Sequence, residues 1–398
     1  MSDSELPVAP PARSLLSDLS LPAIVAGFVT VLVGFTSSAA IVFQAAQAAG
    51  ATPAQLASWM WALGLGMGVT CIVLSLRYRV PVVTAWSTPG AAMLTAGAAG
   101  LDMAQATGAF VVSALLITLA GFSGVFERLI NRIPVSIASG MLAGVLLRFG
   151  LDAFVALESQ FGLAVAMIAA YLLMRRWHPR YAVVATLLLG VAIATTRGLL
   201  DLGTVQLQFA QPVWVTPVFT LNALVSVALP LFLVTMASQN VPGVAVIRAS
   251  GYSVPISPVI GWTGAVNLVL APFGAFALNL AAITAAICMG REAHEDPARR
   301  YVAAVSAGVF YCIVGIFGAT VAAVFAAFPR ELIVVIAGLA LLGTIGNGLA
   351  AALSDSHERE AALLTFLVTA SGITLFGIKS AFWGLVAGAV ALLLRARA

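Results

Sequence analysis

The chain has 398 residues, of which 61% are hydrophobic and only 9% are charged, and its formal net charge is +4. A soluble domain carries about 25% charged residues, so this composition excludes a soluble enzyme, a nucleic-acid-binding protein and a disordered chain. The mean hydropathy of +1.07 and the long unbroken apolar runs predict an all-α polytopic membrane protein. A membrane β-barrel would instead alternate apolar and polar residues along each strand.

Charged residues and Pro or Gly breaks divide the apolar sequence into fourteen predicted membrane spans. A membrane-spanning helix needs about 20 residues, and most of the apolar runs approach this length. Residues 1–20 are expected to form a cytoplasmic tail, and residues 198–217 an outer linker. In chain order the predicted spans are about 21–48, 54–76, 80–99, 103–122, 133–151, 159–175, 181–197, 218–241, 257–271, 272–290, 299–327, 330–352, 360–377 and 380–395.

The distribution of Lys and Arg predicts the orientation of these spans, because cytoplasmic loops are enriched in both residues. With the N-terminus in the cytoplasm and the connections on alternating sides, fifteen of the 19 cationic residues fall on the cytoplasmic side. The four on the outer side are Arg148, Arg197, Arg330 and Lys379. We therefore predict a multi-pass protein with both termini in the cytoplasm.

An internal repeat relates the two halves of the chain. Residues 35–50 and 236–251 match at a constant offset of 201, which aligns Ser, Ala and Gly residues. Seven predicted spans separate the two copies, and because seven is odd the copies have opposite orientations in the membrane. The sequence thus predicts a 7+7 inverted repeat, with residues 21–197 as the first repeat and residues 218–398 as the second.

The third and tenth spans are interrupted. Residues 80–97 and 271–288 each begin with a Pro-containing, strand-like stretch, which is followed by a helix-capping residue and a short run of good helix formers. In the first, Ser87 or Thr88 is the capping residue before Pro89, and Pro is favoured at the first helical position. In the second, Asn279 is a good N-cap at the same distance from a preceding Pro. Ordinary helices kinked by Pro are the alternative interpretation.

The two interrupted spans predict an anion site. Each half-helix would be about ten residues and about 15 Å long, half of the hydrocarbon core, so its N-terminus would lie near the midplane. In an inverted repeat the two N-termini face each other. Each carries about half a positive charge and several free N–H groups, so together they can hold an anion without Lys or Arg.

Further polar residues lie deep in the first and eighth spans. Ser37 and Ser38 either contact the substrate or bond back to their own helix. Gln239 and Asn240 are amides in hydrocarbon, which is costly unless they are paired, and we interpret them as part of the binding site. Phe276 would provide an apolar wall or bulk packing. The expected substrate-binding residues are Ser37, Ser38, Ser87, Thr88, Gly90, Ser238, Gln239, Asn240, Phe276, Leu278, Asn279 and Leu280.

Three segments of the chain resemble the benzoate/proton symporter (BenE) family of bacterial inner-membrane carriers. The segments are WSTPGAA at 86–92, MASQNVPGVAVIRASGY at 236–252 and NLAAITAAICMGREAHEDPARRY at 279–301. This family is similar in fold to the nucleobase and SLC26-type anion transporters. The resemblance implies import of benzoate or a close aromatic carboxylate together with protons, across the inner membrane.

The resemblance also implies a division into two domains. A core domain would carry the substrate, and a gate domain would flank it. The core domain would comprise about 21–122 and 218–327, and the gate domain about 133–197 and 330–395.

Other functions remain open at the level of the sequence. The eighth and tenth spans contain no acidic residue, whereas nucleobase transporters bind the base with glutamates there, so a carboxylate substrate is favoured. The second candidate is an SLC26-like exchanger or uncoupled carrier of inorganic anions or small aliphatic carboxylates. Arg148, inside an apolar run, would snorkel to the outer surface or attract anions at an outer vestibule.

Catalytic and metal-binding patterns give no support to an enzyme. No paired acids, Ser/His set or metal-ligand cluster falls at the predicted midplane, and the three Cys show no CxxC spacing. We therefore expect no enzymatic activity, no metal and no cofactor. A homodimer is compatible with the sequence, because lipid-facing and dimer-facing apolar surfaces look alike.

Overall fold

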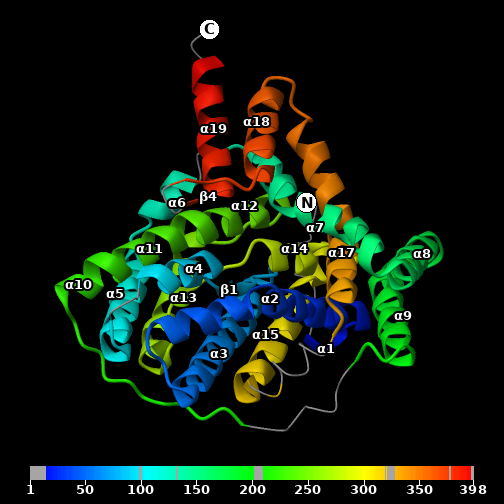
Figure 1. Ribbon diagram of the computed structural model, residues 1–398. Coiled ribbons are helices and arrows are strands. Elements are labelled where there is room, and N and C mark those ends of the chain that lie inside the picture. The colour runs from blue at the N-terminus through cyan, green and yellow to red at the C-terminus, as the bar shows by residue number, and fades with distance from the viewer. Residues whose placement is uncertain are drawn as a thin grey trace, which may run out of the picture.

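The computed structural model describes residues 15–97, 101–130, 133–200, 209–318, 320, 328–375 and 378–395, and it is mostly helical (Figure 1). Within these residues, seven helical segments are long and apolar enough to cross a membrane. They are Pro53–Tyr78 (α3), Met103–Phe122 (α5), Val135–Ser159 (α7), Leu221–Ala249, Ile256–Phe273, Pro297–Ile316 and Arg330–Ala352 (α17).

One group of helices surrounds the centre of the molecule. Helix α15 (Tyr301–Ile316) packs against α3 and α2 (Leu21–Ala48), and α13 (Ile256–Leu270) packs against α5. Helices α3 and α15 approach closely because glycines line their contact, as is common between membrane helices. A Cβ atom at Gly64 would lie only 2.5 Å from the Gly315 Cα atom.

A second group of helices packs mainly within itself. Helix α7 contacts α17 and α18 (Arg359–Ala370), α18 contacts α19 (Ser380–Arg395), and α8 (Phe161–Trp177) contacts α9 (Ala182–Thr196). A glycine again allows two helices to approach closely, here α7 and α18, since a Cβ atom at Gly140 would lie 2.6 Å from the Ala362 carbonyl oxygen. Figure 1 shows α18 and α19 side by side at the C-terminal end.

The helical segment Leu221–Ala249 is irregular. It consists of α10 (Leu221–Ala223), α11 (Leu229–Thr235) and α12 (Val241–Ala249), joined by π-helical turns at Leu224–Ala228 and Met236–Asn240. Pro230 and Pro242 follow these turns, and neither residue has an N–H for the carbonyl four residues earlier. Such π-helical turns are frequent at functional sites.

The predicted N-terminal tail is partly folded. Helix α1 (Leu15–Asp18) places the Asp18 carboxylate at a buried position, where it accepts a 2.9 Å hydrogen bond from the Tyr301 hydroxyl. Arg79 and Arg299 each lie 3.5 Å from the same carboxylate. Residues 15–20 are therefore attached to the helical body through an ion-pair network, while residues 1–14 lie outside the described part of the chain.

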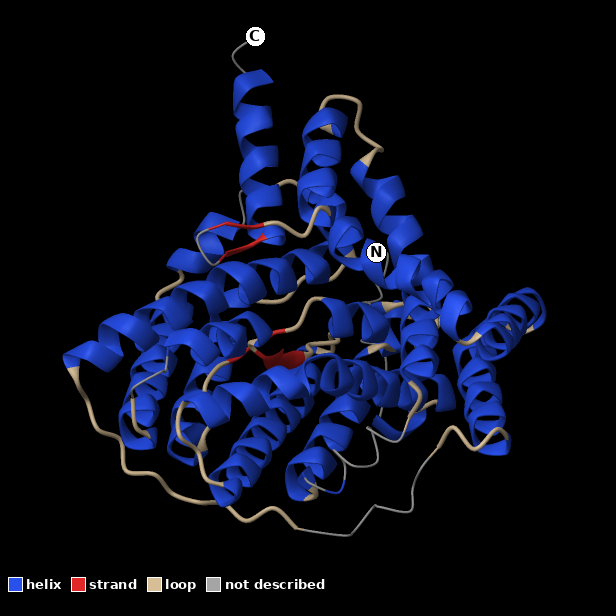
Figure 2. Ribbon diagram, viewed as in Figure 1, coloured by secondary structure: helices blue, strands red, loops and turns tan. Residues whose placement is uncertain are grey.

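Two short strand pairs complete the fold (Figure 2). Strand β1 (Thr84–Trp86) pairs antiparallel with β2 (Leu278–Leu280) in the middle of the molecule. Strands β3 (Thr374–Leu375) and β4 (Ile378–Lys379) form a small hairpin before α19. The central pair joins segments that are almost 200 residues apart in the sequence, and it positions the site described next.

Candidate functional site

The candidate site is built around the crossing of β1 and β2. The register places Ala85 opposite Asn279, and the ladder continues through backbone bonds from Ser87 N–H to Ala277 O (3.1 Å) and from Ala281 N–H to Val83 O (2.9 Å). A half-helix follows each strand, with residues 88–97 after β1 and residues 283–289 after β2. Because β1 and β2 are antiparallel, the chain runs in opposite directions along the two strands before it enters these helices.

The first half-helix confirms the sequence prediction. Helix α4 (Thr88–Gly97) has 10 residues and begins at Thr88 with Pro89 in its first turn. The Ser87 hydroxyl accepts a 3.1 Å hydrogen bond from the Gly90 N–H, so Ser87 caps the helix. The Thr235 hydroxyl in turn donates to the Ser87 oxygen at 3.2 Å, which fixes this cap against the irregular helix.

The second half-helix begins later than predicted, and the assignment of Asn279 as its N-cap is wrong. Helix α14 (Ile283–Met289) has 7 residues, and Asn279 lies in the middle of β2 instead. Pairing with β1 keeps residues 278–281 extended, so a helix can form only after them. The Asn279 side chain donates to the Leu280 carbonyl oxygen at 2.9 Å, and its own oxygen has no hydrogen-bond partner among the described residues.

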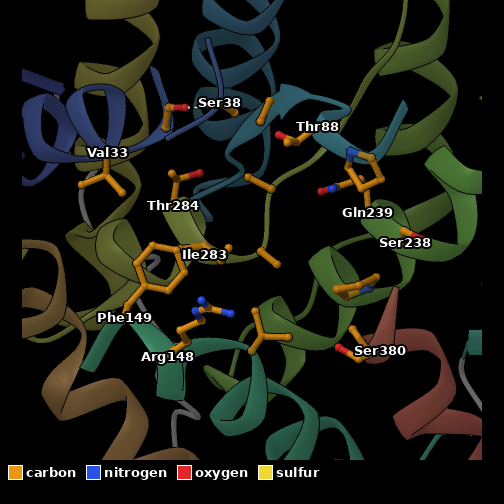
Figure 3. Close-up of a pocket in the computed structure, with 18 of the residues that line it drawn as sticks. Val33, Ser38, Thr88, Arg148, Phe149, Ser238, Gln239, Ile283, Thr284 and Ser380 are labelled. Carbon is orange, nitrogen blue, oxygen red and sulfur yellow. Dashed lines mark hydrogen bonds between the residues drawn. The ribbon is translucent and has the colours of Figure 1, made fainter. Parts of the chain in front are cut away.

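A cavity of about 340 Å³ lies at the start of both half-helices (Figure 3). This volume is in the range of small-molecule sites, which are mostly apolar with a few polar groups. Its aromatic lining residues are Trp86, Phe149 and Tyr311. Residues 281–284, with Thr88 and Pro89, bring the two helix starts to the cavity wall.

Hydrogen bonds within one wall fix the orientation of Trp86. Its indole N–H donates to the Ser38 hydroxyl oxygen at 2.8 Å, and the Ser38 hydroxyl donates back to the Gly34 carbonyl at 2.9 Å. The Phe35 ring also contacts Trp86 edge-on, with ring centroids 5.8 Å apart. Ser38 thus bonds back to its own helix and at the same time lines the cavity.

Four of the twelve expected site residues line the cavity, namely Ser38, Thr88, Ser238 and Gln239. The Ser37 side chain lies outside the described part of the chain. The other seven are buried and do not line the cavity; they are Ser87, Gly90, Asn240, Phe276, Leu278, Asn279 and Leu280.

Three of these seven residues have clear structural contacts. The Asn240 side-chain oxygen accepts the Leu280 N–H at 2.9 Å. Phe276 packs against Trp59, with ring centroids 5.7 Å apart. Gly90 leaves room for a neighbouring side chain, since a Cβ atom there would lie 2.7 Å from the Leu231 Cδ1 atom.

Sequence reasoning did not assign several cavity residues to the site. Arg148 and Phe149 come from α7, Thr284 from α14, Tyr311 from α15 and Ser380 from the start of α19. In the sequence, one feature pointed to Arg148 as a candidate, namely its position inside an apolar run. The others look like ordinary residues of membrane helices, so only their position around the cavity identifies them.

Comparison with known proteins decides the family. A family model described as benzoate membrane transport protein (BenE) matches residues 17–394. The chain belongs to the BenE family. BenE proteins are membrane transporters, so the chain is a membrane transport protein and not an enzyme, and the resemblance stated from the sequence is confirmed.

Two curated relatives cover nearly the whole chain. The inner membrane protein YdcO of Escherichia coli is 53% identical over 371 residues, which are 93% of this chain and 94% of that protein. The benzoate membrane transport protein of Acinetobacter baylyi is 39% identical over 379 residues, which are 95% of this chain and 96% of that protein.

Two solved structures are similar at low sequence identity. SLC26A9 has a TM-score of 0.48 and 12% identity, and the match covers 96% of this chain and 67% of that one. The transmembrane domain of the cyanobacterial bicarbonate transporter BicA has a TM-score of 0.47 and 14% identity, with coverages of 93% and 97%.

Proposed function

We propose that this BenE-family protein is a secondary active transporter that imports benzoate or a related aromatic carboxylate together with protons. The cavity at the β1–β2 crossing carries this proposal, because it combines aromatic walls with polar groups at two helix starts. Trp86, Phe149 and Tyr311 offer apolar surface to a benzene ring. The name of the Acinetobacter baylyi relative supports benzoate as the substrate class, and that of YdcO supports a bacterial inner-membrane location.

The carboxylate would be held near the starts of α4 and α14. The first N–H groups of a helix have no partner within the helix, and the helix dipole favours negative charge at this end. Residues 88–89 and 281–284 bring these ends to the cavity. No acidic side chain is among the cavity-lining residues that the structure describes, so a carboxylate would meet no repelling charge there.

The architecture supports a 7+7 inverted repeat as part of the proposal. The first repeat would comprise α2, α3, β1 with α4, α5, α7, α8 and α9. The second would comprise the segment Leu221–Ala249, α13, β2 with α14, α15, α17, α18 and α19. The broken elements then occupy the third and tenth positions. The antiparallel pairing of β1 with β2 is what opposite orientations of the two repeats require.

Transport would proceed by alternating access, with the two groups of helices as its moving parts. The helices around β1 and β2 would form the core domain that carries the substrate. Helices α7–α9 and α17–α19 would form the gate domain, since they pack mainly on one another. The cavity has lining residues from both groups, so movement of one group against the other would expose it to one side and then to the other.

Uptake of labelled benzoate into proteoliposomes, with and without an imposed pH gradient, tests this function. We expect saturable uptake that an inward proton gradient accelerates and that unlabelled benzoate inhibits. Saturable uptake of chloride, sulfate or acetate without benzoate uptake would contradict the proposal and support a carrier of inorganic anions or small aliphatic carboxylates. Benzoate uptake that is indifferent to the pH gradient would contradict the proton coupling.

A further inference from the structure

A single charged side chain lines the cavity among the lining residues that the structure describes, and it is Arg148. Arg148 is on α7, in the second group of helices, whereas the half-helices belong to the first. Figure 3 shows its guanidinium beside the Phe149 ring, directed into the space below Ile283 and Thr284. Arg148 is exposed and lines the cavity.

The position of Arg148 along α7 differs from the position that the sequence predicts. The sequence predicts a span that ends near residue 151, which would place Arg148 close to its outer end. Helix α7 instead continues to Ser159, so Arg148 lies one residue beyond the midpoint of a 25-residue helix. Either end of the helix is then about 17–20 Å away along its axis, farther than an Arg side chain reaches.

No acidic side chain neutralises Arg148 within the described residues. Among the described residues, the Arg148 guanidinium has no ion pair and no hydrogen bond. A charge in an apolar environment is costly unless it is paired or hydrated. In the empty cavity water can hydrate the guanidinium, and an anion that enters can replace this water.

We propose that Arg148 receives the substrate carboxylate and makes the cavity selective for anionic over neutral aromatic molecules. The planar guanidinium presents parallel N–H donors that match the two oxygens of a carboxylate. The adjacent Phe149 places an aromatic wall where the ring of the same substrate would lie. This inference rests on the proposed function for the aromatic part of the substrate, but the recognition of negative charge stands on the geometry alone.

The proposal assigns two partners to the carboxylate from two groups of helices. Arg148 contacts it from α7, and the first turns of α4 and α14 contact it from the opposite wall. A neutral amide of the same shape would lack the charge-assisted bonds to the guanidinium. Benzoate and benzamide therefore form a matched pair of probes, since they differ in charge and hardly in size.

The test measures binding of both probes to detergent-purified protein by calorimetry. In the wild type we expect benzoate to bind more tightly than benzamide. Arg148→Gln should lower the benzoate affinity about 10- to 100-fold, the range for hydrogen bonds to charged groups, and should leave the benzamide affinity unchanged. Arg148→Lys keeps the positive charge but lacks the parallel N–H donors of the guanidinium. Its benzoate affinity should therefore fall less than that of Arg148→Gln. Arg197→Gln removes the same charge from an exposed residue outside the cavity and should change neither affinity.

A measurement of thermal stability separates recognition from a structural role. Removing an unpaired charge from an apolar wall should leave the melting temperature of the ligand-free Arg148→Gln variant unchanged or higher. A folded Arg148→Gln variant that binds benzoate within about twofold of the wild type would overturn the proposal, as would equal wild-type affinities for the two probes. If Arg148→Gln does not fold, the test uses the ratio of benzoate to benzamide affinity in Arg148→Lys. The proposal expects this ratio to be lower than in the wild type, and an unchanged ratio would overturn it.

The failure of this inference is distinguishable from the failure of the proposed function. Benzoate uptake that persists with unchanged affinity in Arg148→Gln would overturn the role of Arg148 and leave the proposed function standing. Binding of chloride or bicarbonate that requires Arg148, without any benzoate binding, would support the role of Arg148 and contradict the aromatic substrate.

Discussion

The side-chain oxygen of Asn240 accepts a 2.9 Å hydrogen bond from the backbone N–H of Leu280. This bond connects the π-helical turn Met236–Asn240 to strand β2, and both residues are buried. The Asn240 Nδ2 atom lies 3.1 Å from the Met236 sulfur. Gln239, the next residue along the chain, lines the cavity instead. The two adjacent amides therefore have different surroundings, and their substitutions should have different effects.

We expect Asn240→Leu to lower the stability of the protein by about 1–3 kcal/mol, because it leaves the buried Leu280 N–H without an acceptor. Gln239→Leu makes the same chemical change one residue away and is the matched control. It should weaken benzoate binding while changing the melting temperature little. Thermal unfolding in detergent and benzoate binding by calorimetry check both expectations. Weakened binding with unchanged stability in Asn240→Leu would show that Asn240, too, acts on the substrate.

The start of α4 could be predicted from the sequence because its signals are local. Thr88 precedes Pro89 and a run of helix formers, and α4 begins where these residues indicate. The start of α14 depends on a contact between residues that are far apart in the sequence. Asn279 has the side chain of a good N-cap, but pairing with Ala85 holds it in a strand. No pattern within residues 271–288 reveals this partner.

The role of Arg148 could not be predicted because it depends on the length and packing of α7. Phe154 and Val155 continue the apolar character of this helix beyond Asp152, and both are exposed on its surface. A single acidic residue ends a span in a hydropathy analysis, but it does not end a helix. The helix therefore extends to Ser159, and the cavity forms at its middle, where α18 and α19 also contribute residues.

The predicted orientation can be checked by cysteine labelling. In a background with Cys312→Ser, Ser356→Cys and Gln211→Cys each place a thiol at an exposed position. The positive-inside pattern places residue 356 in the cytoplasm and residue 211 outside. We expect a membrane-impermeant maleimide to label intact cells at 211 only, and at both positions after permeabilisation. Labelling of intact cells at 356 but not at 211 would contradict the inverted-repeat topology.

Glu127 should stabilise the protein in a pH-dependent manner. Burial acts to raise the pKa of its carboxyl, but hydrogen bonds from Ser257 and Ile256 and the charge of Arg248 outweigh burial and lower the pKa below its usual 4.5. A lowered pKa contributes stability above the usual value, and this stability is lost as the pH falls through the folded-state value. Glu127→Gln should therefore lower the melting temperature at neutral pH, and the difference should shrink in acid. A pH-independent difference would contradict this account.

Glu292 should show the opposite pH dependence. Burial raises the pKa of its carboxyl, and the nearby Arg175, Arg300 and Tyr171 offset this only in part. The charged form is thus disfavoured by folding, so stability decreases as the pH rises from 4.5 through the folded-state value. Glu292→Gln should raise the melting temperature at neutral pH and change it little in acid. A scan of melting temperature between about pH 4 and pH 8 on both Glu variants provides the comparison, since each is the control for the other.

The aromatic wall of the cavity should distinguish benzoate from aliphatic carboxylates. Phe149 lines the cavity beside Arg148. Replacement by Ala removes the ring contact, which is worth about 0.5–1.5 kcal/mol beyond the area that it buries, and it leaves the groups for the carboxylate in place.

We therefore expect Phe149→Ala to weaken benzoate binding at least several-fold and to leave the affinity for acetate unchanged. The exposed Phe161, at the start of α8, offers the matched control Phe161→Ala, which should change neither affinity. Competition of unlabelled acetate and benzoate against labelled benzoate is measured in the wild type, Phe149→Ala and Phe161→Ala. It gives the ratio of the benzoate and acetate affinities directly. If Phe149→Ala weakens both ligands equally, the residue shapes the cavity as a whole. The selectivity for aromatic substrates would then have to come from Trp86 and Tyr311 on the opposite group of helices.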